Sequence, residues 1–198
     1  MFKVLKREFY LRNTILVAKE LLGKIIVKKN GRQLLSGKIV ETEAYIGNHD
    51  PACHAYQNIT GRSAMLYEKG GTIYVYFIYG NYYCFNLVTE KEGNGCAVLI
   101  RAVEPISGIN IMKINRNKIS KIIDLTNGPS KFCMAFGIGR NHNGLDATSS
   151  AIKVFEPVIK EKFDIITTKR IGISSGIELP YRYYIKNNPF VTKHKFNF

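Results

Sequence analysis

The run of residues 72–88 constrains the fold more than any other part of this sequence. It is rich in aromatic and β-branched residues, which favour strands, and it is interrupted only by Gly80-Asn81, a pair typical of a tight hairpin turn. A second pair of apolar runs, 25–27 and 37–40, surrounds the turn-forming residues 29–32. The sequence therefore predicts two β-hairpins.

Shorter signals complete a mixed fold. Residues 13–23 predict a helix that Asn13 or Thr14 can cap and Gly23 can end, and Pro129 predicts a second helix over 130–136. Further strands are expected at 97–103, 152–155 and 181–185. With 198 residues, 45% of them hydrophobic, the chain can build a core without disulfides or a structural metal. We expect an α+β fold in which residues 1–198 form a single compact domain. Its curved, largely antiparallel β-sheet would carry peripheral helices and a protruding β-hairpin.

The charge balance points to a polyanionic partner. Lysine and arginine outnumber the acids by 29 to 15, a formal net charge of +14. Such a surface attracts nucleic acid, although a basic protein of a lysine-rich proteome would show the same excess.

The cysteines and the apolar runs bear on location. Four cysteines are scattered without C-x-x-C spacing, and no apolar run is long enough for a membrane helix. The N-terminus has no apolar signal core. We expect a soluble, reduced protein of a prokaryotic cytoplasm, acting as a monomer.

One predicted strand carries two carboxylates. Over residues 38–45, alternation places Ile39, Glu41, Glu43 and Tyr45 on one face and Val40, Thr42 and Ala44 on the other. The polar face could be an ordinary solvated surface paired with lysines, or it could line a cleft.

The loop that follows supplies a histidine. His54 could return to the same cleft and bind a substrate, or it could be structural. His49, Asp50, Cys53 and His54 could also be read as zinc ligands, but no second pair with suitable spacing follows. We expect no metal and no cofactor.

Several tyrosines lie in the predicted hairpin over residues 72–88. Such side chains more often build a core, but they can also stack on bases when they lie within a basic surface. Tyr79 and Tyr82 flank the expected tip, from which a side chain cannot easily reach the core of its own sheet. The stripe consists of Tyr74, Tyr76, Tyr79, Tyr82 and Tyr83.

Taken together, these motifs resemble the alkyladenine (3-methyladenine) DNA glycosylase family. The similarity runs in order from about residue 9 to 192. The matching segments are Leu21-Leu22-Gly23-Lys24, Gly37-Lys38-Ile39-Val40-Glu41-Thr42-Glu43-Ala44-Tyr45, Ala52-Cys53-His54, Tyr74-Val75-Tyr76-Phe77-Ile78-Tyr79-Gly80, Cys84-Phe85-Asn86, Val98-Leu99-Ile100-Arg101-Ala102-Val103-Glu104-Pro105, Asn127-Gly128-Pro129-Ser130-Lys131 and Leu179-Pro180-Tyr181-Arg182-Tyr183-Tyr184.

The resemblance implies a role for each matching residue. Glu43 corresponds to the general base that activates a water for attack on the anomeric carbon. Arg101 corresponds to the arginine that positions Glu43 and this water. Glu41 would be a supporting residue. The flipped base would be bound by Tyr45, His54, Tyr76 and Asn86, and Tyr79 would intercalate through the minor groove. Lys131 is a candidate contact to the DNA backbone, although it could equally be a solvated lysine.

The implied activity is a monofunctional one. A flipped, damaged purine in double-stranded DNA would be hydrolysed from its sugar, which leaves an abasic site without strand cleavage. The substrate would be 3-methyladenine, with 7-methylguanine, hypoxanthine and ethenoadenine as further candidates. Residues 60–66 depart from the segment that many relatives have behind the pocket, which bears on lesion preference.

Two other functions fit part of the pattern. A hydrolase of free nucleosides would also use paired glutamates, but it would not need a charge of +14. A non-catalytic DNA-binding module would need the charge and the aromatics but not the carboxylates.

Binding to duplex DNA should weaken steeply with salt, because lysines and arginines that contact phosphates release counterions. Fluorescence anisotropy should show at least about a tenfold loss of affinity between about 50 and about 200 mM salt. A flat dependence would contradict the electrostatic interpretation.

Overall fold

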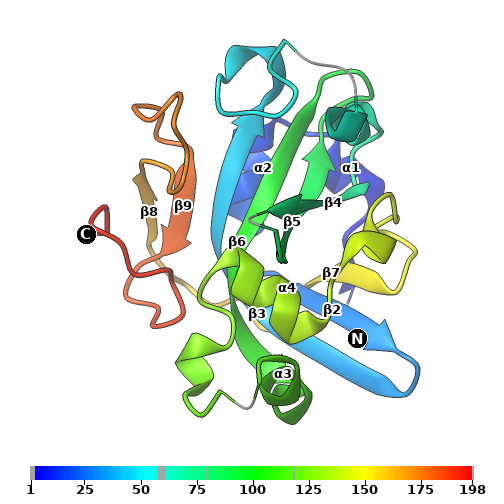
Figure 1. The fold of residues 1–198 in the computed structure, drawn as a ribbon, viewed down its shortest axis with the longest axis vertical. Coiled ribbons are helices and arrows are strands. Elements are labelled where there is room, and N and C mark those ends of the chain that lie inside the picture. Colours follow the sequence, from blue (N-terminus) through cyan, green and yellow to red (C-terminus); the bar gives the residue numbers. More distant parts are fainter. Residues whose placement is uncertain (1–2, 58–60, 79, 118, 198) are drawn as a thin grey trace.

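Nine strands form one sheet in the computed structural model, which describes residues 3–57, 61–78, 80–117 and 119–197. All pairings between the named strands are antiparallel, and the main order is β1-β7-β2-β3-β6-β5-β4 (Figure 1). The strands are β1 (Lys3–Val4), β2 (Ile25–Asn30), β3 (Gln33–Ile46), β4 (Ile73–Ile78), β5 (Tyr82–Thr89), β6 (Cys96–Ser107), β7 (Ile152–Glu156), β8 (Ile165–Thr168) and β9 (Arg182–Ile185).

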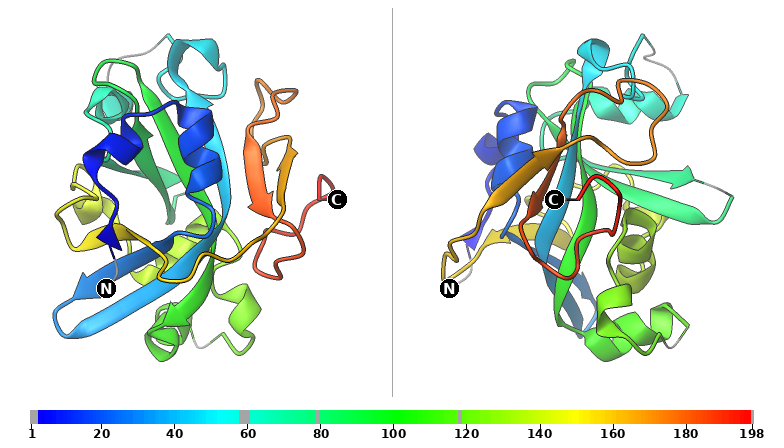
Figure 2. Two further views of the ribbon diagram at one scale, coloured as in Figure 1. Left: turned by 180° about the vertical axis from the view of Figure 1, so that it is seen from behind. Right: turned by 90° about the vertical axis from the view of Figure 1, so that its left-hand side faces the viewer.

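Helices cover both faces of this sheet. The helices α1 (Arg7–Tyr10) and α2 (Thr14–Glu20) lie on one side, and α3 (Ile109–Asn115) and α4 (Pro129–Phe136) lie on the other (Figure 2, right). The same view shows β4 and β5 projecting away from the body. The predicted α+β class, with its antiparallel sheet and protruding hairpin, is confirmed. Among the described residues no helix has the length and apolarity to cross a membrane.

Most of the expected elements are present. Both hairpins form, and α2 begins where predicted, since the Asn13 side chain accepts hydrogen bonds from the amides of Ile15 and Leu16. Gly23 adopts a left-handed φ of +81°, as expected of a residue that ends a helix, although α2 itself stops at Glu20. The short elements β1, α1, α3 and β8 were not predicted.

The strand β3 is the hub of the sheet. It pairs with β6 along one edge, and along the other it pairs first with β2 and then, at residues 41–43, with β9. The hydroxyl of Thr42 donates a hydrogen bond of 2.8 Å to the carbonyl oxygen of Ala18 in α2. Because side chains alternate along a strand, Glu41 and Glu43 point away from α2.

A double irregularity in the pairing of β3 with β6 prepares the site. Ile39 pairs with Val103 and Glu41 with Ala102, so Val40 is an extra residue on β3. Thr42 then pairs with Ile100, which leaves Arg101 as the extra residue on β6. Bulges of this kind redirect side chains. The alternation predicted from Ile39 onward therefore does not hold across the bulge, and Ile39 joins the large core cluster.

The core lies mainly between the sheet and its helices. The larger cluster includes Phe85 of β5, whose ring meets that of Phe132 in α4 edge to face at 5.9 Å. A second, smaller cluster contains Cys53, Leu66 and Tyr74 and borders the end of β3. This smaller cluster forms the floor of the pocket described below.

Gly47, directly after β3, should not tolerate a side chain. Its φ is +40°, and an added Cβ would lie 2.4 Å from the carbonyl oxygen of Asn94. Gly31 has a similar φ of +57° but open space around it, so Gly31→Ala measures the cost of the backbone conformation without a steric clash. Gly47→Ala should therefore lower the melting temperature more than Gly31→Ala, by an extra ~1–3 kcal/mol of unfolding free energy. Equal losses in thermal denaturation would contradict this packing.

Candidate active site

Glu43 lies at the centre of a buried set of hydrogen-bond donors. Its side chain has no exposed surface. Oε2 accepts hydrogen bonds from the Tyr45 hydroxyl at 2.9 Å and from Nη1 of Arg101 at 3.2 Å. Oε1 accepts one from the backbone amide of Ile171 at 2.8 Å. The carboxylate is therefore fixed in one orientation.

Glu41 is equally buried and holds the arginine that serves Glu43. Its Oε1 accepts hydrogen bonds from Nε of Arg101 at 3.1 Å and from Nε of Arg182 at 2.7 Å. Its Oε2 accepts one from the backbone amide of Thr192 at 2.8 Å. Arg101 thus bridges the two glutamates, and the interpretation of this face as a solvated surface paired with lysines is wrong.

The charges of this network set its protonation. Burial raises the pKa of the Glu41 carboxyl, but Arg101 and Arg182 lower it more, and the net pKa lies below its ordinary value. Burial lowers the pKa of Arg101, and the charges of Glu43 and Glu41 raise it above its usual range. Burial and the charge of Glu43 both raise the pKa of Tyr45 far above its usual value. The Tyr45 hydroxyl therefore keeps its proton and donates a hydrogen bond to Glu43.

A small pocket adjoins the carboxylate through Tyr45. Its volume is about 20 Å³, which is room for one water molecule. All four residues predicted to bind the flipped base line it. The lining consists of Tyr45, Ala52, Cys53, His54, Leu66, Tyr74, Tyr76, Asn86 and Ala97.

Hydrogen bonds and ring contacts order the pocket wall. Nδ1 of His54 lies 3.0 Å from the Tyr74 hydroxyl, and the His54 ring meets the Tyr76 ring edge to face at 4.6 Å. The rings of Tyr74 and Tyr76 stack at 5.3 Å. Asn86 donates from Nδ2 to the carbonyl oxygen of Tyr74 on the paired strand, at 3.1 Å.

Of the two predicted contacts to DNA, Lys131 and Tyr79, the structure describes only Lys131, which does not line this pocket. Lys131 is the third residue of α4, and its Nζ donates to Oδ1 of Asn127 at 2.7 Å. Tyr79 falls outside the described residues. A larger cavity of about 550 Å³ opens beside α2 and the segment 157–165, and it contains none of the predicted site residues.

Two of the four residues considered as zinc ligands have other partners. Asp50 forms a buried ion pair with Arg170, and the Cys53 thiol donates to the carbonyl oxygen of Gly95. Within residues 3–57, 61–78, 80–117 and 119–197, no three histidine, cysteine or acidic side chains are grouped so that they could hold a metal ion.

Comparison with known proteins decides the family. The family model for methylpurine-DNA glycosylase (MPG) matches residues 8–189. The chain belongs to the methylpurine-DNA glycosylase family. It is therefore an enzyme of DNA repair, a hydrolase of N-glycosyl bonds, and the resemblance given by the sequence is confirmed.

Three bacterial relatives agree with this membership of the methylpurine-DNA glycosylase family. A protein of Francisella tularensis subsp. tularensis (strain WY96-3418) is 51% identical over 183 residues, which cover 91% of this chain and 94% of the relative. One of Carboxydothermus hydrogenoformans is 48% identical over 96% of this chain and 99% of the relative. A protein of Clostridium botulinum (strain Loch Maree / Type A3) is 46% identical over 95% of this chain and 98% of the relative. Each is named "Putative 3-methyladenine DNA glycosylase".

Sequence reasoning missed part of the network in this glycosylase. Arg182 lies within a motif that matched the family, but no role was assigned to it. Arg170 carried no signal, because nothing in a sequence distinguishes a buried arginine from the many exposed ones. The amides of Ile171 and Thr192 could not be found either, since any residue supplies a backbone N–H.

Glu41→Gln should separate the charge of Glu41 from its shape. Removing one partner of a buried ion pair costs about 3–5 kcal/mol. We therefore expect the free energy of unfolding, measured by urea denaturation at neutral pH, to fall by a similar amount. The control is Glu20→Gln, because Glu20 pairs with Arg12 at the surface, where such pairs contribute about 0–1 kcal/mol.

The same pair of variants tests the pH dependence. Because the folded pKa of Glu41 is lowered, its stabilisation is complete above its ordinary value of 4.5 and is lost as the pH falls through the folded value. Below pH 4.5, wild type should lose stability more steeply than Glu41→Gln. Parallel acid profiles would show that Glu41 is not a charged partner of the two arginines.

Proposed function

We propose that this glycosylase removes alkylated purines, 3-methyladenine foremost, from double-stranded DNA. The damaged nucleotide is flipped out of the duplex, and a water activated by Glu43 attacks its anomeric carbon. The products are the free base and an abasic site in an unbroken strand. Hypoxanthine, ethenoadenine and 7-methylguanine are further candidate substrates.

The observation that carries this proposal is the position of Glu43. Its carboxylate is fixed by Tyr45, Arg101 and Ile171, and Tyr45 also lines the aromatic pocket. A base bound in that pocket would therefore bring its sugar toward Glu43. The sugar becomes oxocarbenium-like as the bond breaks, and a fixed carboxylate both stabilises that charge and orients the water.

The hydrogen bonds also favour one oxygen as the base. A carboxylate oxygen has two lone pairs, and both on Oε2 are used, by Tyr45 and Arg101. Oε1 accepts only the Ile171 amide from the described residues, so it retains one acceptor site. We assign the proton of the attacking water to Oε1.

The pocket supports recognition of a planar, electron-poor base. Tyr45, Tyr76 and His54 offer aromatic surfaces, and Asn86 supplies a polar group. Rings of this kind bind cationic groups, and an N3- or N7-alkylated purine carries positive charge. A purine is larger than the present 20 Å³, so side chains of the pocket wall would have to rearrange to enclose the whole base.

The remaining roles follow from charge and sequence. Tyr79 would fill the gap left by the flipped base, Lys131 would contact a phosphate, and the net charge of +14 would attract the duplex without reading its sequence. We further propose that the chain works as a monomeric, single-domain protein in the bacterial cytoplasm, with no cofactor.

The geometry gives less support to a hydrolase of free nucleosides. Such an enzyme typically uses a second carboxyl group as a general acid. Glu41 is the only neighbouring candidate on β3, but it accepts bonds from two arginines and its pKa is lowered, so it stays ionised at neutral pH. Release of base from free nucleosides would favour this alternative.

Glu43→Gln tests the proposal. General acid–base catalysis contributes about 10²–10⁴-fold, so single-turnover release of hypoxanthine and of methylated purines should fall by at least about 100-fold. Binding to the damaged duplex should persist, because glutamine keeps the shape of the side chain. Glu20→Gln, a surface substitution, should release base at the wild-type rate.

Two results would contradict the assignment. Release by Glu43→Gln at the wild-type rate would remove Glu43 from catalysis. Loss of folding or of duplex binding, with the same fall in activity, would make its role structural.

A further inference from the structure

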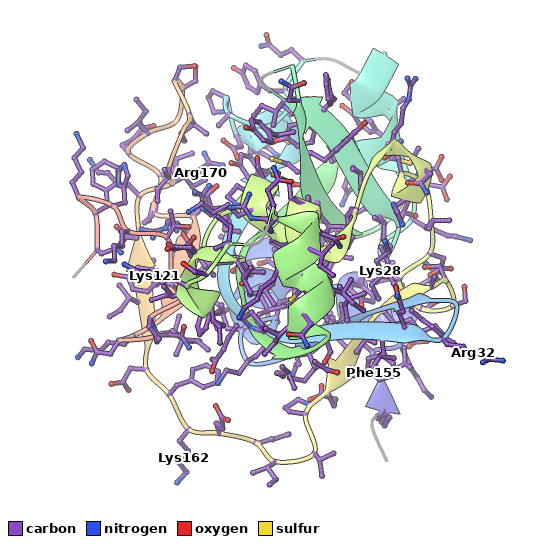
Figure 3. The ribbon with its side chains drawn as sticks, turned by 60° about the horizontal axis from the view of Figure 1, so that its bottom comes forward. Lys28, Arg32, Lys121, Phe155, Lys162 and Arg170 are labelled. Carbon is purple, nitrogen blue, oxygen red and sulfur yellow. The ribbon has the colours of Figure 1, made fainter. Side chains whose placement is uncertain are left out.

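A further buried ion pair, between Asp50 and Arg170, lies next to the residues of the active site. Asp50 and Arg170 are both fully buried, and the guanidinium binds the carboxylate in a bidentate manner, with Nη2 to Oδ1 at 2.7 Å and Nη1 to Oδ2. Nη1 also donates to the carbonyl oxygen of Ala44, at 2.9 Å. In Figure 3, Arg170 lies among crowded side chains, whereas Arg32 and Lys162 extend outward.

These contacts join two distant segments. Ala44 lies on β3 between Glu43 and Tyr45, and Asp50 lies in the loop that leads to His54. Arg170 lies in the segment that follows β8. One guanidinium therefore links the strand that bears the glutamate to a segment more than 100 residues away.

Arg170 is connected to the active site in two ways, through the backbone of the next residue and through its own side chain. The residue next to it, Ile171, donates its amide to Oε1 of Glu43 at 2.8 Å. The guanidinium carbon also lies over the Tyr45 ring, 4.7 Å from its centre, and 5.3 Å from the centre of the Tyr181 ring. Both Glu43 and its partner Tyr45 thus depend on where Arg170 is held.

We propose that Arg170 is a positioning residue of this glycosylase. Its ion pair with Asp50 holds the Ile171 amide on Glu43 and supports the ring of Tyr45, and it acts on the reaction only through them. The inference rests on the proposed role of Glu43. It extends that role to a residue with no direct access to the substrate.

The chemistry of the contacts requires arginine. A planar guanidinium can bind a carboxylate with two parallel bonds, donate to a carbonyl and stack on a ring at the same time. A lysine ammonium keeps the charge but cannot reproduce this arrangement. Stability alone gives little reason for the pair, because a well-packed apolar pair is often as stable as a buried ion pair.

Arg170→Lys is the first variant, and Arg12→Lys is its matched control. Arg12 also binds a carboxylate in a bidentate manner, that of Glu20, and lies over the ring of Phe9 at 4.5 Å, but at the surface and away from the site. Because a lone buried carboxylate can prevent folding, the neutral pair Asp50→Asn with Arg170→Gln is the second variant.

Three quantities are measured for each variant: melting temperature, the single-turnover rate constant at saturating enzyme with a hypoxanthine duplex, and hydrogen exchange of the Ile171 amide. Misplacement by about 1 Å can cost about 100-fold in rate. We expect Arg170→Lys and the neutral pair to lose about 10- to 100-fold in rate and the protection of the amide. Affinity for undamaged duplex and the properties of Arg12→Lys should remain at the wild-type level.

Other outcomes would overturn the proposal. If the neutral pair regains both the melting temperature and the wild-type rate, Arg170 is structural only. If the amide stays protected in Arg170→Lys, the ion pair does not hold it. Should wild type release no base from this duplex or from methylated DNA, the proposed function fails, but the exchange of the Ile171 amide still decides whether Arg170 holds that amide.

Discussion

The structure depends on burying two glutamates of one strand, Glu41 and Glu43, among hydrogen-bond donors, since neither side chain is exposed at the surface. Burying a charged group costs several kcal/mol unless it is paired and hydrogen-bonded. Glu41 and Glu43 satisfy this requirement through Arg101 and Arg182 and through the amides of two segments that lie far away in the sequence. Because Asp50 is neutralised in the same way by Arg170, three acidic and three basic groups balance within a small volume.

This requirement explains several features of the fold. The extra residue in β6 is Arg101 itself, so the bulge aims the guanidinium between the two glutamates. The strand β9 pairs with β3 beside those glutamates and delivers Arg182. The C-terminal residues wrap back so that Thr192 reaches Glu41. An apolar cluster of similar volume is often as stable as buried ion pairs, so these charges support the proposal of a site that is ordered in advance for chemistry.

The sequence predicted the local elements and the face that bears the site, but not the network. Alternation along β3 correctly placed Glu41, Glu43 and Tyr45 together, and the turn residues of both hairpins predicted their pairing. The bulge at Val40 could not be foreseen, because it depends on the partner strand. The same holds for Arg170 and for the amides of Ile171 and Thr192. Their contribution comes from contacts more than 100 residues apart in the chain, which no local pattern records.

The most direct test of this account is product analysis of a methylated duplex treated with the wild-type enzyme. Mass spectrometry of the reaction, without alkali or heat, measures both the released base and the strand that remains. Hydrolysis by a water held on Glu43 predicts free methylated purine and an equal amount of full-length strand with an abasic aldehyde. A broken strand, a strand bound covalently to the protein, or no free base would contradict it.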